Sequence, residues 1–122
     1  MRVLIVDDQE FIRRGIRVVL ADAPEIEVCG EAKDGVDAIE KALQLLPDVV
    51  LMDISMPEMT GIEATRMILA ERPAVRVIGL SMFEENEQAK AMREAGAVAY
   101  LTKSGASEAV IAAIRTCVGV GT

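Results

Sequence analysis

Three aspartates stand where apolar runs end, and together they could bind a cation and accept a chemical group. Asp7 and Asp8 directly follow the apolar run 3–6, and Asp53 follows the run 49–52. If both runs are strands of an open α/β sheet, their carboxyl ends lie at the rim where ligands bind. Carboxylates gathered there repel each other unless a cation or a shared proton lies between them. The pattern predicts a cation site beside an aspartate that can be modified.

Two further polar side chains, Ser81 and Lys103, follow the apolar runs 75–80 and 98–101. Oxygen ligands suit Mg²⁺, which keeps several waters and accepts a few carboxylates. With Mg²⁺ present, Asp53 would be an ionised nucleophile toward a phosphoryl group, since aspartyl phosphates are known covalent intermediates. The ammonium of Lys103 and the hydroxyl of Ser81 would then contact the phosphoryl oxygens. Each residue taken alone also fits a turn, cap or surface role. Their joint occurrence at strand ends is what favours chemistry.

Apolar runs alternate with stretches of helical period, and this alternation predicts an α/β fold with a parallel sheet covered by helices on both faces. The expected strands are 3–6, 26–32, 49–52, 75–80 and 98–101. The expected helices are 11–20, 37–46, a segment capped by Thr60 that ends near residue 71, 84–95 and 107–118. Thr60 and Glu63 have the spacing of a capping box. Phe11 and Leu46 are expected on the apolar faces of the first two helices.

The composition of the chain excludes several classes of function. The 122 residues suit one domain, and no run is long enough to span a membrane. The net charge of −7 argues against nucleic acid binding by this segment. The absence of histidine excludes a Ser-His-Asp triad and any histidine-based zinc site, so phosphohistidine chemistry must come from another protein. Cys29 and Cys117 lack metal or redox spacing and are expected to be buried free thiols. The start of the chain lacks the pattern of a signal peptide, which favours a cytoplasmic protein.

These motifs resemble the receiver domain of a two-component response regulator over essentially the whole chain. The matching segments are Val-Leu-Ile-Val-Asp-Asp at 3–8, Asp-Val-Val-Leu-Met-Asp-Ile-Ser-Met-Pro-Glu-Met-Thr-Gly at 48–61, Leu-Ser at 80–81 and Gly-Ala-Val-Ala-Tyr-Leu-Thr-Lys at 96–103. Two segments, Met-Asp-Ile-Ser-Met-Pro at 52–57 and Gly-Glu-Ala-Lys-Asp-Gly at 30–35, are similar to the LuxR/NarL subfamily, whose second domain is a helix-turn-helix.

The resemblance implies a flavodoxin-like, doubly wound fold with strand order 2-1-3-4-5, and it implies a role for each candidate residue. Asp53 would accept a phosphoryl group from a sensor histidine kinase. The Mg²⁺ ligands would be Asp7, Asp8, Asp53 and the backbone carbonyl of Ser55. The remaining roles fall to Ser81 as switch hydroxyl, Tyr100 as an aromatic that turns inward on phosphorylation, Lys103 as the phosphoryl contact, and Pro57 and Gly61 as residues that shape the loop. Glu31 and Lys33, near the end of the second strand, are expected to be peripheral.

The resemblance also implies how the domain is used. Residues 1–118 would form the receiver domain, and 119–122 would begin a linker or mark the edge of the segment. An output domain outside this chain would bind DNA and regulate transcription, and phosphorylation would favour a homodimer. The protein would be a switch with self-catalysed phosphorylation and dephosphorylation, not a turnover enzyme. Phe83 and Ser104 depart from the usual receiver pattern, and the Ser104 departure leaves open whether the 103–104 peptide bond is cis.

Three other functions compete with this one. A haloacid-dehalogenase-like phosphatase also uses an aspartyl nucleophile and Mg²⁺, but that family needs a second aspartate where this chain has Ser55. A nucleotide-binding domain would need a glycine-rich turn after the first strand, where the chain has the acidic Asp7-Asp8-Gln9-Glu10. The third alternative is an interaction module that works without phosphorylation.

Overall fold

The computed structural model describes residues 1–54, 56, 59–81, 87–103 and 107–117. It contains a parallel sheet with strand order β2-β1-β3-β4-β5, which confirms the expected doubly wound topology. The strands are β1 (Arg2–Val6), β2 (Glu27–Ala32), β3 (Val49–Asp53), β4 (Arg76–Ser81) and β5 (Ala99–Thr102). The helices are α1 (Glu10–Leu20), α2 (Gly35–Leu45), α3 (Gly61–Glu71), α4 (Glu87–Glu94) and α5 (Ser107–Cys117).

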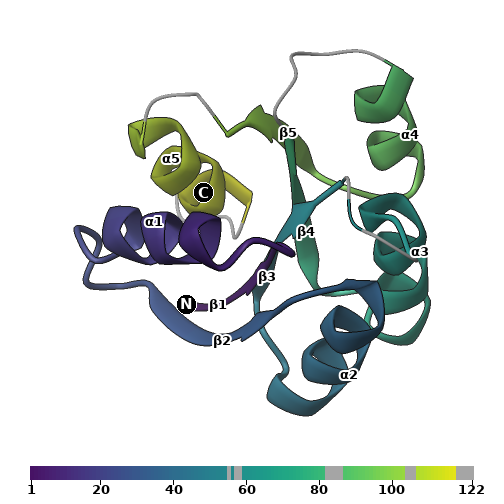
Figure 1. Ribbon diagram of the computed structural model, residues 1–122, viewed down its shortest axis with the longest axis horizontal. Coiled ribbons are helices and arrows are strands. Elements are labelled where there is room, and N and C mark those ends of the chain that lie inside the picture. The colour runs from purple at the N-terminus through teal and green to yellow at the C-terminus, as the bar shows by residue number, and fades with distance from the viewer. Residues whose placement is uncertain (55, 57–58, 82–86, 104–106, 118–122) are drawn as a thin grey trace.

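The helices form two layers around the sheet. Figure 1 shows α1 and α5 on one face and α2, α3 and α4 on the other. Successive side chains of a strand point to opposite faces, so each strand supplies both layers. In β1, Val3 and Ile5 join the cluster that contains Leu20 of α1 and Ile114 of α5. This face carries the helix that follows the acidic residues at the end of β1.

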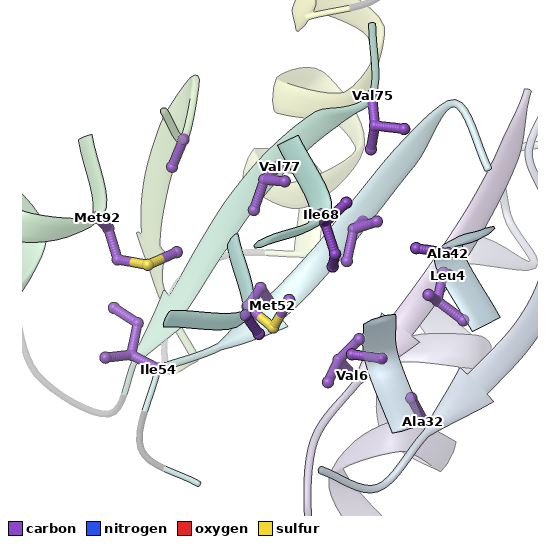
Figure 2. Close-up of a cluster of buried hydrophobic side chains, with 14 of the residues drawn as sticks. Leu4, Val6, Ala32, Ala42, Met52, Ile54, Ile68, Val75, Val77 and Met92 are labelled. Atoms are coloured by element: carbon purple, nitrogen blue, oxygen red, sulfur yellow. The ribbon is translucent and has the colours of Figure 1, made fainter. Parts of the chain in front are cut away.

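The second hydrophobic cluster lies under α2, α3 and α4. Leu4 and Val6 of β1 belong to it, together with Met52, Ile68 and Met92, and Figure 2 shows these side chains between the sheet and the helices. Both clusters include residues of β3, whose five residues are all buried. A continuous apolar strand of this kind is typical of a central strand in a parallel sheet. Burial of β3 on both faces of the sheet holds the backbone of Asp53, its last residue, in a defined position.

The structure confirms the expected cap at the start of α3, but two apolar side chains expected on helix faces are exposed. The side chain of Thr60 accepts a hydrogen bond from the Glu63 backbone N–H at the start of α3, as the capping box predicts. Leu46 instead ends α2 in the left-handed conformation, with φ of 51°, and its side chain is 53% exposed. Phe11 is 68% exposed, so the broad apolar face expected for α1 is wrong at this residue. Only one stripe of a helix can face a flat sheet, and these two side chains lie outside that stripe.

Cys29 and Cys117 are free, as expected, but they are half-buried and not fully buried. Ser55, Pro57, Phe83, Ser104 and the segment 119–122 lie outside the described residues, as does the expected start of the fourth helix at residue 84. None of the helices in the described part of the chain has the length and hydropathy needed to cross a lipid bilayer.

Candidate functional site

The candidate residues come together because neighbouring parallel strands end at one rim of the sheet. Asp7 follows β1, Asp53 ends β3, Ser81 ends β4, and Lys103 follows β5. The register pairs Asp53 with Leu80 and Ser81 with Thr102, which aligns the ends of the last three strands. The backbone N–H of Lys103 donates to the Ser81 carbonyl at 2.7 Å, so the lysine starts from a fixed point beside β4.

Three carboxylates meet at this rim. Asp7, Asp8 and Asp53 each offer one oxygen, and these oxygens lie within 4.8 Å of one another. Asp7 and Asp53 are buried, whereas Asp8 is exposed at the mouth of the site. An oxygen-only donor set with one open side suits a hard divalent cation that keeps part of its water shell.

Lys103 supplies the positive charge closest to the carboxylates. Its Nζ lies 2.7 Å from Oδ2 of Asp7 and 3.0 Å from Oδ1 of Asp53. Oδ2 of Asp7 is buried and accepts no hydrogen bond of ordinary geometry from the described residues, although the ammonium lies beside it as an ion pair. One ammonium cannot neutralise three carboxylates, so the cluster keeps a net negative charge. The buried Asp7 oxygen and this excess charge fit a bound cation.

The same environment perturbs two ionisable groups. Burial raises the pKa of Asp53 to about 6; the hydrogen bond from Lys103 acts in the opposite direction, and the charges of Asp7 and Asp8 add to the rise. Burial disfavours the charged form of Lys103, but its close contacts with the Asp7 and Asp53 carboxylates outweigh burial and raise the pKa of the ammonium. A divalent cation beside Asp53 would favour its ionised form.

The loop after β3 passes very close to Asp53. The Gly61 backbone N–H donates to the Ile54 carbonyl at 2.9 Å, and a Cβ on Gly61 would lie only 2.2 Å from the Asp53 carbonyl oxygen. Only glycine allows this approach. The expected loop-shaping role of Gly61 thus has a physical reason. Ser55 and Pro57 of the same loop lie outside the described residues.

Ser81 and Tyr100 occupy neighbouring strands beside the carboxylates. Ser81 is buried at the end of β4, and Tyr100 in β5 is 8% exposed. A Cβ on Gly79 would lie 3.4 Å from Cδ2 of Tyr100 and 3.0 Å from Cε of Met92, so the missing side chain makes room for both residues. From the sequence, an inward Tyr100 was expected only after phosphorylation. The structure holds the ring inward already.

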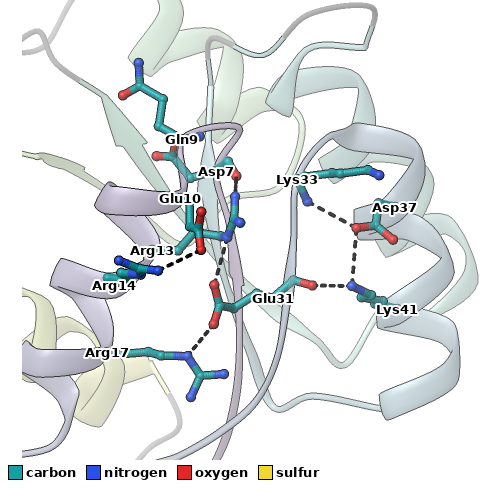
Figure 3. Close-up of polar contacts among 10 residues, drawn as sticks. All are labelled: Asp7, Gln9, Glu10, Arg13, Arg14, Arg17, Glu31, Lys33, Asp37 and Lys41. Atoms are coloured by element: carbon teal, nitrogen blue, oxygen red, sulfur yellow. Dashed lines mark hydrogen bonds and ion pairs between the residues drawn. The ribbon is translucent and has the colours of Figure 1, made fainter.

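The sequence did not identify Arg13 and Glu31 as parts of the site's surroundings. Arg13 of α1 hydrogen-bonds both Glu31 of β2 and the backbone carbonyl of Asp7, so Glu31, expected to be peripheral, is linked to the site indirectly through Arg13 (Figure 3). The two residues are 18 positions apart, and neither lies in an apolar pattern. Their opposite charges could have suggested the pair, because a long basic side chain on α1 can reach the edge strand beside β1.

The chain is similar to a known protein family over nearly its whole length. The family model of the response regulator receiver domain matches residues 3–115. The response regulator UvrY of Escherichia coli (strain K12) is 44% identical over 116 residues, which cover 95% of this chain and 53% of UvrY. The transcriptional regulatory protein LiaR of Bacillus subtilis (strain 168) is 42% identical over 115 residues, or 94% of this chain and 54% of LiaR. The chain thus spans about half the length of these relatives.

Solved structures share the fold closely. A LuxR-family two-component response regulator from Aurantimonas sp. SI85-9A1 superimposes with a TM-score of 0.90 at 35% identity, covering 94% of this chain and 82% of that chain. A chain of the CheX–CheY–BeF3–Mg²⁺ complex from Borrelia burgdorferi superimposes with a TM-score of 0.87 at 26% identity, covering 95% and 87%.

Proposed function

The chain belongs to the response regulator receiver domain family, and on that basis we propose that Asp53 is its phosphoryl acceptor. One observation carries the proposal: Asp53 is buried at the sheet rim, 3.0 Å from the Lys103 ammonium and beside the acidic pair. A carboxylate oxygen of Asp53 attacks the phosphorus, the new O–P bond forms, and the P–N bond of a donor phosphohistidine breaks. The imidazole leaves with the electron pair and takes up a proton. The histidine belongs to another protein, because this chain has none.

Mg²⁺ is the proposed cofactor, held by Asp7, Asp8 and Asp53 and by the backbone carbonyl of Ser55. The net negative charge of the cluster supports this assignment, because the Lys103 ammonium offsets the charge of one carboxylate out of three. A similar protein fold in the CheX–CheY–BeF3–Mg²⁺ complex also supports it. When bound, the cation neutralises charge on the carboxylates and on the incoming phosphoryl oxygens. Asp7 and Asp8 directly follow β1, at the same rim of the sheet as Asp53.

Lys103 and Ser81 would recognise the phosphoryl group once it is attached. The ammonium of Lys103 now pairs with Asp53, and transfer of that pairing to a phosphoryl oxygen keeps the charge compensated. Ser81 lies at the end of the next strand and would donate its hydroxyl. Movement of the Lys103 ammonium away from Asp7, together with the attraction of Ser81 toward the phosphoryl group, would change the preferred position of Tyr100. The switch would then be a shift in population between inward and outward orientations of the Tyr100 ring.

The partner that supplies the phosphoryl group is proposed to be a sensor histidine kinase. A groove of about 350 Å³ beside the site is lined by Phe11, Ile16 and Val110 and reaches Lys103. Phe11 is exposed there, and Val18 on the same helix is also exposed. An apolar helix surface next to the reactive residue suits the helical face of a kinase.

The length of the relatives supports a role for this chain within a longer protein. The relatives are about twice the length of this chain, and LiaR is described as a transcriptional regulator. We infer that this receiver controls an output domain that binds DNA, with residues 119–122 leading toward it, and that phosphorylation favours a homodimer. The switch would act in the cytoplasm and would catalyse its own phosphorylation and dephosphorylation.

Intact-mass spectrometry with acetyl phosphate tests the acceptor directly. The wild-type chain should gain one phosphoryl group in Mg²⁺ and none in EDTA, and Asp53→Asn should gain none. Asp48→Asn is a matched control, because Asp48 lies at the opposite end of the sheet, where its carboxylate bonds the Arg2 N–H. A folded wild-type chain that stays unmodified would favour the interaction module over the phosphoacceptor.

A further inference from the structure

Arg13 connects the edge of the sheet to the acidic site. Its Nη1 donates to the backbone carbonyl of Asp7 at 2.7 Å, and its Nε donates to Oε1 of Glu31 at 2.8 Å. Figure 3 shows the guanidinium between the two acceptors, reaching from α1 to the ends of β1 and β2. The Arg13 side chain is only 16% exposed. A partly buried guanidinium with two fixed acceptors has a more restricted orientation than a lysine on a flexible stem.

Glu31 is itself held in place from several sides. Its other carboxylate oxygen pairs with Nε of Arg17, and its backbone carbonyl accepts from Nζ of Lys41 (Figure 3). Glu31 also pairs in register with Ile5 of β1, so its backbone is part of the sheet. Arg13 is therefore anchored to a rigid strand, and its contact with Asp7 is not a chance position of a mobile side chain.

Asp7 has a partner at each of its other polar atoms. Its N–H donates to the Ala32 carbonyl at 3.1 Å, its Oδ1 accepts from the Gln9 N–H at 2.9 Å, and its Oδ2 faces Lys103. The Arg13 contact completes this set by fixing the carbonyl. That carbonyl belongs to the peptide group between Asp7 and Asp8, so its direction determines where the exposed Asp8 side chain emerges.

We propose that Arg13, oriented by Glu31, is a positioning residue that sets the affinity of the acidic cluster for Mg²⁺. It acts through the peptide group that joins Asp7 to Asp8 and touches neither the cation nor the phosphoryl group. The inference rests on the proposed function, because it assumes that Asp7 and Asp8 are ligands. Residues that hold a ligand in place commonly change metal affinity by about 10–100-fold when they are removed.

Charge alone predicts the opposite result, which makes the role testable. Removal of a positive charge near a cation site reduces repulsion and should tighten Mg²⁺ binding slightly. Arg14, on the same helix, provides the comparison: among the described residues its ionic partner is Glu10, and both side chains are well exposed. Arg13→Met and Arg14→Met remove the same charge, but only Arg13→Met removes the hydrogen bond to Asp7.

Isothermal titration calorimetry with MgCl2 measures the affinity without any phosphoryl transfer. We expect Arg13→Met to raise the dissociation constant by about 10-fold, and Arg14→Met to leave it unchanged or lower it by less than 2-fold. Arg13→Lys keeps the charge and loses the planar fork, so it should resemble Arg13→Met. Glu31→Gln keeps Arg13 and loses its anchor, and it should weaken binding about 3-fold or more. Circular dichroism establishes that each variant is folded.

The outcomes distinguish a failure of the proposed metal site from a failure of the proposed role of Arg13. If the wild-type chain binds no Mg²⁺ at the cluster, the proposed metal site fails, and the role of Arg13 fails with it. If the wild type binds Mg²⁺ and folded Arg13→Met binds it equally well or more tightly, the role of Arg13 is overturned while the metal site stands. Should Arg13→Met fail to fold, Glu31→Gln and Arg13→Lys decide the question: wild-type affinity in both would overturn the proposal.

Discussion

The Lys103 ammonium lies 3.0 Å from Oδ1 of Asp53, so the residue that would accept the phosphoryl group is already paired with a cation from another strand. The same ammonium lies 2.7 Å from Asp7. Both carboxylates are buried. Lys103 thus compensates two buried charges in the folded state, and its contribution to stability can be measured.

Replacement of Lys103 by methionine should destabilise the fold. Lys103→Met keeps most of the side-chain volume but leaves two buried carboxylates without their shared cation, which costs about 2–4 kcal/mol at pH 7.5. The loss should be smaller at pH 5, where Asp53 is mostly protonated because its pKa is about 6. Urea unfolding in EDTA at the two pH values gives the free energies.

Lys90→Met provides the control for this experiment. Lys90 is 81% exposed and pairs with Glu94 at 4.0 Å, so its loss should change the free energy of unfolding by less than about 0.5 kcal/mol. Equal effects of the two substitutions would show that the buried ion pairs at the rim contribute nothing special.

Asp53→Asn should stabilise the protein at neutral pH in the absence of metal. The pKa of Asp53 is raised from 3.8 to about 6 on folding, so the native state binds more protons than the unfolded state between these values. The stability from this group is therefore present at low pH and lost as the pH rises through 6. Asparagine removes that loss, and we expect a gain of about 1–3 kcal/mol at pH 7.5.

Urea titrations of both proteins in EDTA, at pH 4.5 and pH 7.5, measure the effect. Other groups, such as Glu31 with its lowered pKa, contribute equally to both proteins and cancel in the difference. The advantage of Asp53→Asn should grow with pH. A difference that is constant or shrinks with pH would mean that the Asp53 carboxyl is not strained by burial.

Two glycine substitutions should have opposite effects. Gly61→Ala would place a Cβ 2.2 Å from the Asp53 carbonyl oxygen, so the loop must move at a cost of about 1–3 kcal/mol. Gly15→Ala meets nothing within 4 Å in the middle of α1 and should stabilise the protein by about 0.5–1 kcal/mol through helix propensity. Thermal unfolding of both variants, with Mg²⁺ titration of Gly61→Ala, tests the pair. A neutral Gly61→Ala would contradict the close approach.

Much of the fold could be predicted because two periodicities carry it. The alternation of apolar runs and helical stretches gave the order of the elements, and the rule that parallel strands share one rim brought Asp7, Asp53, Ser81 and Lys103 together. Both predictions depend on the repeated pattern of many residues, so single exceptions do not disturb them.

The residues that could not be predicted depend on contacts between distant elements. Phe11 is apolar and has helical spacing, yet it faces solvent because the stripe that contacts the sheet is narrower than the apolar face. Arg13 and Glu31 look like ordinary surface charges until α1 packs beside β2. The inward position of Tyr100 in β5 is possible because Gly79, in the neighbouring strand β4, has no side chain. The two residues lie side by side only once the sheet has formed.

Chemical trapping of the modified residue tests the central claim most directly. Borohydride reduces an aspartyl phosphate to homoserine, so peptide mass spectrometry after reaction with acetyl phosphate, Mg²⁺ and borohydride identifies the acceptor by position. We predict homoserine at residue 53 and at no other aspartate, and its loss when Mg²⁺ is replaced by EDTA. Homoserine at residue 7 or 8, or none in a folded chain that binds Mg²⁺, would contradict the assignment of Asp53.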